Sequence, residues 1–447
     1  MNQLQERLVE IQSPAQSANE LDIPMSLVVD LIYRLLFSEG DVSMGRFTEI
    51  IKIHAQLLDE IMARLKQEHM VEISKAGALG RFSYTYRLTE EGTKRARESM
   101  ERSQYIGAAP VSLDKYSEAI LLQTGDTRFV GPKEVQRSLR SLVLPDGFHR
   151  RIGPAVNAGS SLFLYGPPGN GKTTIAQAIA SLLAGTEPIW LPYAITVGGQ
   201  IVQIFDPLVH LPANNVFHNG NGHSNGNGNG GSYSNGGMGS GGAKIDKRWG
   251  LFKRPAVMAG GELKMDALDL RYEPVAKFYE APLQLKANGG MFLIDDFGRQ
   301  QMSPQDLLNR WIVPLESGVD FLRLQSGQTI EVPFRQLSVF STNLDPGDLV
   351  DDAFLRRIQM KVEVSGPDEK MYYQIFKIMC SAYQLPYDQN SFVHLIQNWY
   401  RKSGRSMQSV HPRDILKAVT SICRYEQIEL QLTPQLIDEA CLSYFVN

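Results

Sequence analysis

Apolar residues recur at helical spacing from Leu21 to about residue 68 of this 447-residue chain. The spacing predicts helices over 25–37, 47–53 and 54–68, and in the third Leu57, Leu58, Ile61, Met62 and Leu65 share one face. Alternating apolar residues then predict a β-hairpin over 70–74 and 84–89. Thr89, followed by two glutamates, predicts the start of another helix.

Three helices, a two-stranded wing and a closing helix resemble a winged-helix domain, and the segment YRLTEEGTKRA is similar to the end of such domains. We therefore predict a winged-helix-like α+β domain over 21–104. A polar, disordered tail is expected over 1–20, and a linker over 105–124.

The central part of the chain changes to short apolar runs followed by glycines or acids. Residues 161–165 predict a buried strand, and a helix is expected from Thr173 to Leu183. Between them lies a GxxxxGK[ST] loop, whose glycines let backbone N–H groups approach phosphate oxygens. The predicted nucleotide-binding residues are Gly166, Pro167, Pro168, Gly169, Asn170, Gly171, Lys172, Thr173 and Thr174. Lys172 is expected at the β- and γ-phosphates of ATP, and Thr173 at Mg²⁺.

Two later strands end in polar side chains at the edge where α/β proteins bind ligands. Residues 291–294 are apolar and precede Asp295, a predicted Mg²⁺ ligand through water, and Asp296, which would polarise the attacking water. The next strand ends at Asn343, which could orient the same water. Arg356 and Arg357 follow, and their guanidinium groups suit phosphate in a neighbouring subunit's site.

In order along the chain, GPPGNGKTT, FLIDD, the strand ending at Asn343 and DDAFLRRI resemble the AAA+ ATPases. The resemblance implies an α/β P-loop core over 125–365, a parallel sheet flanked by helices, with a C-terminal helical lid over 366–447. It also implies that Val130 and Gly131 lie against adenine and that Arg413, in the segment HPRDI, is a second sensor.

Two finer resemblances concern the branch within that family. APLQLKANGG is similar to the MoxR-like branch, and FLIDDFGRQ with LLNRWIVPLESG and AFLRRI resembles bacterial predicted ATPases with chaperone activity. Asp296 departs from the pattern because a Glu more often stands there, and the Asp side chain is one methylene shorter, so either the attacking water lies closer or the turnover rate falls. Lys172 and Asp295 are also separated by long insertions (295 − 172 = 123 positions), which include a Gly/Asn-rich stretch over 219–242 that we expect to be disordered.

Composition excludes several classes of protein. The net charge is −3, only three cysteines occur, and no apolar run suits a signal peptide or membrane helix, so a cytoplasmic protein is expected. Residues 20–98 hold 11 Lys/Arg and 13 Asp/Glu, a balance of −2. DNA affinity depends mainly on basic side chains at phosphates, so this balance favours protein as the domain's partner.

Three functions remain open from the sequence. The first is an ATP-hydrolysing ring, expected to be a homo-hexamer, that remodels a protein or protein complex. The second is an ATP-dependent DNA-associated factor that uses the winged helix, and the third is a slow nucleotide-dependent switch. ATP and Mg²⁺ are the expected cofactors in each.

Overall fold

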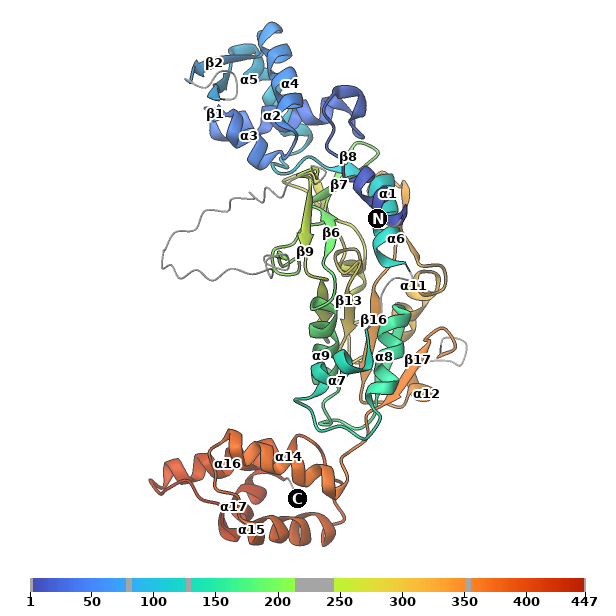
Figure 1. The fold of residues 1–447 in the computed structure, drawn as a ribbon, viewed down its shortest axis with the longest axis vertical. Helices are drawn as coiled ribbons and strands as arrows, with labels where there is room; N and C mark the ends of the chain where they lie inside the picture. Colours follow the sequence, from blue (N-terminus) through green and yellow to red (C-terminus); the bar gives the residue numbers. More distant parts are fainter. Residues whose placement is uncertain (1–2, 78–82, 126–129, 214–244, 350–354, 446–447) are drawn as a thin grey trace.

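The computed structural model describes residues 3–77, 83–125, 130–213, 245–349 and 355–445. Figure 1 shows an elongated molecule, with an N-terminal domain at one end, a central region built on sheets, and C-terminal helices at the other end. The predicted disordered insertion at 219–242 lies outside the described residues.

The N-terminal domain packs its helices on a small antiparallel sheet with the strand order β1-β3-β2. Thr89 caps the closing helix, because its hydroxyl accepts a hydrogen bond of 3.0 Å from the Gly92 N–H. Leu31, Phe47, Leu58 and Met62 are almost fully buried in the domain's core. In chain order the elements are α2 (Met25–Glu39), β1 (Val42–Ser43), α3 (Met44–Ile50), α4 (Ala55–Gln67), β2 (Val71–Lys75), β3 (Thr85–Leu88) and α5 (Glu90–Arg102).

The prediction of a disordered tail over 1–20 is wrong for the residues described there. Helix α1 covers Gln3–Ile11 and a 3₁₀ turn, η1, covers Ala18–Glu20. Ile11 is buried and Leu8 packs against the same cluster, while Arg7 forms an ion pair with Glu118. The apolar stripe of α1 is so narrow that the polar majority of the segment obscures it in the sequence.

The prediction of a linker over 105–124 is also wrong, because this segment is folded and partly buried. Tyr105 packs edge-on against Phe278, with ring centroids 5.4 Å apart. Strand β4 (Val111–Ser112) joins a sheet, and α6 (Leu113–Thr124) buries Tyr116 and Ile120. The Pro and Ala residues that suggested a linker in fact allow close packing between the N-terminal domain and this sheet.

A second five-stranded sheet of mixed direction accounts for part of the long insertion. Its order is β11-β12-β8-β7-β4, and the antiparallel pair β6–β9 lies separately. The strands are β6 (Ile189–Pro192), β7 (Ala194–Val197), β8 (Gln200–Gln203), β9 (Trp249–Phe252), β11 (Arg271–Glu273) and β12 (Phe278–Glu280).

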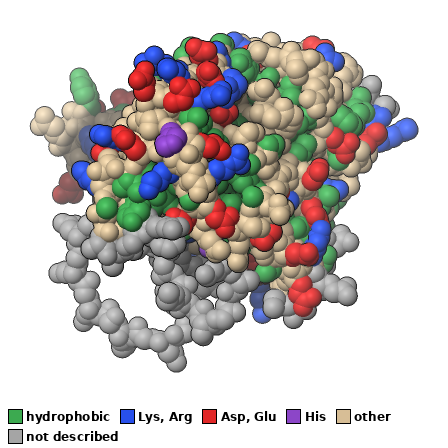
Figure 2. All heavy atoms as spheres, turned by 90° about the horizontal axis from the view of Figure 1, so that it is seen from above, with side chains coloured by type: hydrophobic (Ala, Val, Ile, Leu, Met, Phe, Trp, Pro, Cys, Tyr) green, Lys and Arg blue, Asp and Glu red, His purple; other side chains and the backbone are tan. Residues whose placement is uncertain are grey.

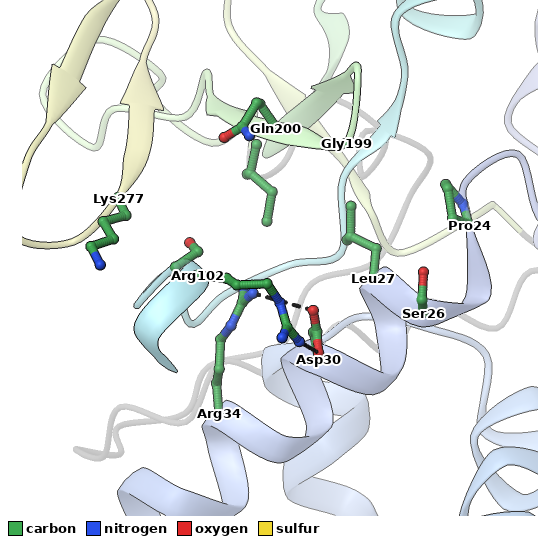
Figure 3. A pocket seen from close by; sticks show the side chains of 11 residues that line it. Pro24, Ser26, Leu27, Asp30, Arg34, Arg102, Gly199, Gln200 and Lys277 are labelled. Atoms are coloured by element: carbon green, nitrogen blue, oxygen red, sulfur yellow. Dashed lines mark hydrogen bonds and ion pairs between the residues drawn. The ribbon is translucent and has the colours of Figure 1, made fainter. Parts of the chain in front are cut away.

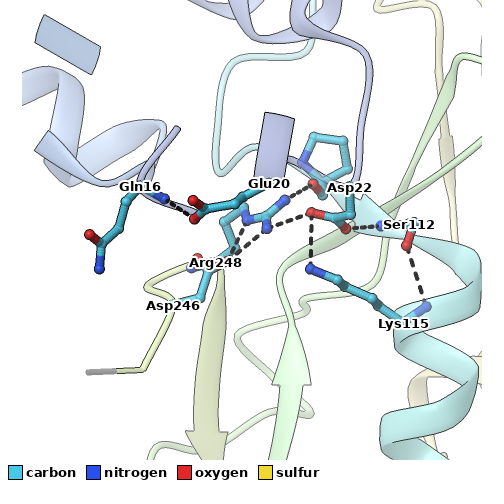
Figure 4. A network of polar contacts seen from close by, with 8 residues as sticks. Gln16, Glu20, Asp22, Ser112, Lys115, Asp246 and Arg248 are labelled. Carbon is cyan, nitrogen blue, oxygen red and sulfur yellow. Dashed lines mark hydrogen bonds and ion pairs between the residues drawn. The ribbon is translucent and has the colours of Figure 1, made fainter. Parts of the chain in front are cut away.

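A buried polar network joins the N-terminal segment to this sheet (Figure 4). Arg248 is 1% exposed, and one Nη atom forms ion pairs of 2.7 Å with both Asp22 and Asp246. Its other Nη atom donates to the Pro110 carbonyl, and Asp22 also accepts from the Ser112 N–H at 2.7 Å. Three segments distant in sequence therefore meet around one guanidinium.

The central sheet is fully parallel and has the order β10-β13-β16-β5-β17. Its strands are β10 (Ala256–Ala259), β13 (Met291–Ile294), β16 (Leu337–Thr342), β5 (Ser161–Tyr165) and β17 (Met360–Glu363). Leu162 and Leu164 enter one buried cluster and Phe163 the other, as expected for a strand covered on both faces.

Helices cover both faces of this sheet, which fits the predicted α/β P-loop core. The first cluster includes residues of α7 (Pro132–Leu139), α8 (His149–Ala158) and α9 (Lys172–Ala184), and the second includes Trp311 of α11 (Pro304–Ser317). The other elements of this region are η3 (Met265–Leu268), α10 (Leu283–Lys286), β14 (Val319–Arg323), β15 (Thr329–Pro333) and α12 (Pro346–Leu349).

The C-terminal helices pack around a core of their own, in which Tyr372, Phe376, Leu395 and Leu416 are almost fully buried. The predicted lid contains α14 (Glu369–Ala382), α15 (Gln389–His394), the π-helical segment η4 (Leu395–Arg401), α16 (His411–Tyr425) and α17 (Pro434–Tyr444). Within the described part of the chain, none of the helices combines the length and apolar character needed to cross a membrane.

Candidate functional site

The predicted phosphate loop connects the buried strand β5 to helix α9. Gly166, Gly169 and Gly171 have φ values of 129°, 74° and 86°. These conformations favour glycine, and a Cβ on Gly166 would lie 2.6 Å from the Val364 carbonyl oxygen. The glycines therefore allow both the loop's turn and its close approach to the chain after β17.

Lys172 lies in the first turn of α9 and is 6% exposed. Its Nζ donates to the carbonyl oxygens of Gly166 and Pro167, at 2.7 and 2.8 Å. Burial lowers the pKa of Lys172, against the opposing effect of the Asp296 and Asp295 carboxylates. Two backbone carbonyls of the phosphate loop therefore hold the Lys172 ammonium in place.

Thr173 and Asp295 come together from opposite ends of the long insertion. The Thr173 hydroxyl donates to an Asp295 carboxylate oxygen at 2.7 Å, across 122 positions of sequence. Asp295 directly follows β13, whose parallel pairing with β10 and β16 brings the strand end to the loop. A hydroxyl and a carboxylate are hard oxygen ligands, and this pair fits Mg²⁺.

Asp296 and Asn343 are also adjacent, since the Asn343 side-chain amide donates to Asp296 Oδ1 at 3.0 Å. Asp296 is exposed and has a φ of 49°, a left-handed conformation that Asp adopts more readily than most residues. Gln300 donates to the backbone carbonyls of Asp295 and Asp296, at 2.9 and 3.2 Å. The sequence pattern missed Gln300, because an isolated Gln in a turn carries no motif.

The predicted arginines lie just after residues 350–354, which are outside the described part. Arg356 is exposed, whereas the Arg357 side chain is 28% exposed and its Nε donates to Glu316 of α11. In the single chain, Arg357 is therefore held by an acidic partner on its own subunit.

Side chains of neighbouring helices hydrogen-bond to the backbone of Val130 and Gly131, the two residues expected near adenine. The Asn157 side chain accepts from the Val130 N–H at 2.8 Å and donates to the Val130 carbonyl at 3.2 Å. Gly131 precedes α7, and its N–H donates to Glu134.

Arg413, the predicted second sensor, lies in the first turn of α16. Its Nε donates to Asp414 at 2.8 Å, and its side chain is 59% exposed.

The phosphate loop also contacts the segment just before α16, which the sequence did not predict. The Val410 N–H donates to the Gly169 carbonyl at 2.9 Å. Asn170 is 5% exposed, and its side-chain oxygen accepts from the Ser409 N–H at 3.1 Å. Loop and C-terminal helices are thus joined through the backbone of the C-terminal segment.

Comparison with known proteins gives partial matches. Residues 368–443 match a family described as a domain of unknown function, DUF8689. Peroxisomal ATPase pex6 of Schizosaccharomyces pombe is 25% identical over 224 residues, which are 45% of this chain and 22% of that protein. Vesicle-fusing ATPase of Dictyostelium discoideum is 42% identical over 53 residues, which are 12% of this chain and 7% of that protein.

Among solved structures, a mutant of RuvB from Thermogota maritima aligns over 76% of this chain and 73% of its own, with 13% identity and a TM-score of 0.36. The matched regions span about a fifth of the first curated relative and less than a tenth of the second. Over part of its length the chain is therefore similar to two ATPases, and its parallel sheet carries the phosphate loop between β5 and α9.

Proposed function

We propose that this chain is a Mg²⁺-dependent ATPase of the AAA+ type whose nucleotide site lies between the phosphate loop and the ends of β13 and β16. The observation that carries the proposal is the 2.7 Å hydrogen bond between Thr173 and Asp295. It joins the loop to the acidic strand at the two side chains that suit the nucleotide's metal ion.

Each side chain has a distinct role in this proposal. Lys172 neutralises the β- and γ-phosphates, and Thr173 with Asp295 holds Mg²⁺, which when bound offsets the negative charge of the phosphates. Asp296 accepts a proton from the attacking water, and Asn343, already hydrogen-bonded to Asp296, orients that water. Val130, Gly131 and Arg413 are proposed to contact the nucleotide from the remaining sides.

A Lys172→Ala variant tests the nucleotide site. It removes the buried cation that spans the loop, so we expect ATP binding, measured by titration calorimetry, to fall below detection. Lys264 is exposed and lies outside the loop, so Lys264→Ala is a matched control that should bind ATP normally. Near-normal affinity in the Lys172→Ala protein would refute the assignment.

We further propose that the chain acts as a ring, on a protein or protein complex bound through the N-terminal domain. The named relatives are a peroxisomal and a vesicle-fusing ATPase, which supports this class of task. Arg356 and Arg357 follow the strand that ends at Asn343, and the proposal places them at the next subunit's nucleotide.

Surface charge on the N-terminal domain favours a protein partner over DNA. Several of its exposed cations lie in ion pairs, among them Arg46 with Glu39, Arg64 with Glu68 and Arg87 with Glu72. Figure 2, which looks onto this end of the molecule, shows acidic and basic side chains intermingled. Phosphate contacts would have to displace these carboxylates, which lowers affinity for DNA.

A capture experiment separates the two partners. Full-length protein carrying Asp296→Asn, held with ATP, should retain a protein partner from cell extract with or without nuclease treatment. Capture that disappears after nuclease, together with gel shifts that depend steeply on salt, would favour the DNA-associated function instead.

A further inference from the structure

A pocket of about 310 Å³ lies between the N-terminal domain and the second sheet, away from the phosphate loop. We call it the junction pocket. Its lining comes from the start of α2, the end of α5, the turn before β8 and the turn between β11 and β12, and it includes Ser26, Asp30, Arg34, Arg102, Gln200 and Lys277. Figure 3 shows Gln200 and Gly199 across the pocket from α2, with Lys277 at one side.

Positive charge dominates this lining. Three cations face one carboxylate, since Arg34, Arg102 and Lys277 accompany only Asp30. Arg102 donates to Asp30 at 2.7 Å, whereas the nearest Arg34 nitrogen lies 3.7 Å from the same carboxylate. The four side chains therefore leave a net charge of +2 within the pocket.

Arg34 is the most unusual member because it is buried and incompletely paired. Its side chain is 5% exposed, and its Nε donates to Ser99 Oγ at 3.0 Å. Its Nη1 atom is buried and has no hydrogen-bond partner. Burial lowers the pKa of Arg34, against the opposing effect of Asp30. A buried guanidinium with an unused donor is costly, and negative charge in the adjoining pocket would offset the cost of burying its positive charge.

The start of α2 contributes in the same direction. This helix of 15 residues has no side-chain cap, and Ser26 and Leu27 of its first turn line the pocket. The N-terminus of a helix carries partial positive charge and unpaired N–H groups, which favour a nearby anion. Lys277 adds an ammonium whose described hydrogen bond, of 2.6 Å, goes to the Glu101 carbonyl.

We propose that the junction pocket binds an organic phosphate monoester. Near neutral pH such a group carries a charge of about −1.5 to −2, which is opposite in sign and similar in size to the net charge of +2 in the lining. Guanidinium groups bind phosphate oxygens in a fork-like geometry, and the ammonium acts as a point charge. The pocket volume is that of about ten water molecules in the liquid, so a bare phosphate ion would leave part of the pocket empty. Leu27 and Ile201 offer apolar contact for the organic part.

The ligand would contact both α2 and β8, and thereby join the N-terminal domain to the second sheet. It could be a free phosphorylated metabolite or a phosphorylated side chain of a protein. Both present the same phosphate monoester to the lining.

Titration calorimetry on the full chain tests the proposal, in a Lys172→Ala background so that the phosphate loop does not contribute. The probes are inorganic phosphate, glycerol 3-phosphate and a phosphoserine peptide with its unphosphorylated counterpart. We expect one saturable site for at least one organic phosphate. Tighter binding of glycerol 3-phosphate supports a metabolite, and tighter binding of the phosphoserine peptide supports a protein source.

Variants locate the binding. Lys277→Met and Arg102→Met should each weaken it about tenfold, the effect of losing one charge-assisted hydrogen bond. Asp30→Asn removes the competing carboxylate and should tighten it, a gain that misfolding would not produce. Lys264→Met, at an exposed site outside the pocket, should change nothing.

Three results would overturn the proposal. They are the absence of saturable binding by either organic phosphate, binding of inorganic phosphate alone, and organic-phosphate affinity unchanged by all three pocket substitutions.

Discussion

The backbone at Asp296 explains the departure of this residue from the acidic motif. Its φ of 49° lies in the left-handed region, where the short side chain of Asp is tolerated better than the longer side chain of Glu. The carboxylate reaches Asn343 from this position. The shorter acid therefore suits the local backbone, and the turn places it at the proposed nucleotide site.

Asp296→Asn should retain ATP binding and lose hydrolysis. The amide keeps the size of the side chain but cannot accept a proton from water, and a positioned base contributes about 10² to 10⁴ in rate. Phosphate release under saturating ATP measures the loss, and calorimetry measures binding. Asp266→Asn, at an exposed turn, is the matched control. Unchanged turnover in the Asp296→Asn protein would mean that a group other than Asp296 accepts the proton of the attacking water.

The individual residues also show what a sequence can and cannot predict about the site. Lys172, Thr173 and Asp295 belong to motifs whose spacing reflects a common geometry, and the structure brings Thr173 and Asp295 together. No sequence motif marks Gln300 or predicts the contact between Asn170 and Ser409. Their partners are backbone atoms positioned by the tertiary fold, so no pattern of residue types reveals them.

At the scale of elements, the segment after β8 contains a buried histidine. His210 is 1% exposed; its Nδ1 accepts from the Asp206 N–H at 2.9 Å and its Nε2 lies 3.0 Å from the Lys286 carbonyl. The neutral ring with hydrogen on Nε2 satisfies both contacts. Burial lowers the pKa of His210 to about 4.

This histidine predicts a loss of stability in mild acid. The folded-state pKa lies below the unfolded value near 6.5, so the stabilising effect is complete above pH 6.5 and lost as pH falls toward 4. The slope should approach about 1.4 kcal/mol per pH unit for this one group. Melting temperature measured from pH 7.5 to 4.5 reports it.

A His210→Gln variant should show a shallower decline over the same range. Part of the decline should remain, because burial also lowers the pKa of His411 to about 4. Superimposable pH profiles for the two proteins would mean that His210 titrates alike in the folded and unfolded chains.

Elements with strong periodicity were the predictable ones. Residues 25–37 and 161–165 were expected as helix and strand, and the structure has α2 and β5 there. Helix α1 and strand β4 were missed because each is stabilised by distant partners rather than by its own pattern. Strand β4 pairs with β7, more than 80 positions later (195 − 111 = 84), and a two-residue strand has no period of its own.

At the scale of the whole molecule, the ring proposal requires Arg357 to leave Glu316. That ion pair lies within one subunit, and Arg357 must exchange it for a neighbour's phosphate during assembly or turnover. An Arg357→Ala protein should therefore bind ATP and lose activity by about 10³ or more. ATPase rate as a function of protein concentration should also rise faster than linearly for the wild-type chain.

Mixing provides the decisive measurement. Arg357→Ala and Lys172→Ala proteins, each inactive alone, should recover partial activity together, because some interfaces then pair an intact loop with an intact arginine. As a matched control, the Arg357→Ala protein is mixed with the Lys264→Ala protein, in which Lys172 and Arg357 are both intact. Full activity in Arg357→Ala alone, with a rate linear in concentration, would show that the subunits hydrolyse ATP independently.

The position of β5 in the central sheet has a consequence for the order in which this protein forms during synthesis. Both neighbours of β5 arise late, since Ser338 of β16 pairs with Ser161 (338 − 161 = 177 positions) and Met360 of β17 pairs with Leu162 (360 − 162 = 198 positions). The N-terminal domain can form while these residues are still untranslated, but β5 has no strand partner until then. A nascent chain that ends before β16 therefore exposes an unpaired apolar strand, and the strand that carries the phosphate loop gains its two neighbours only after β16 and β17 have been made.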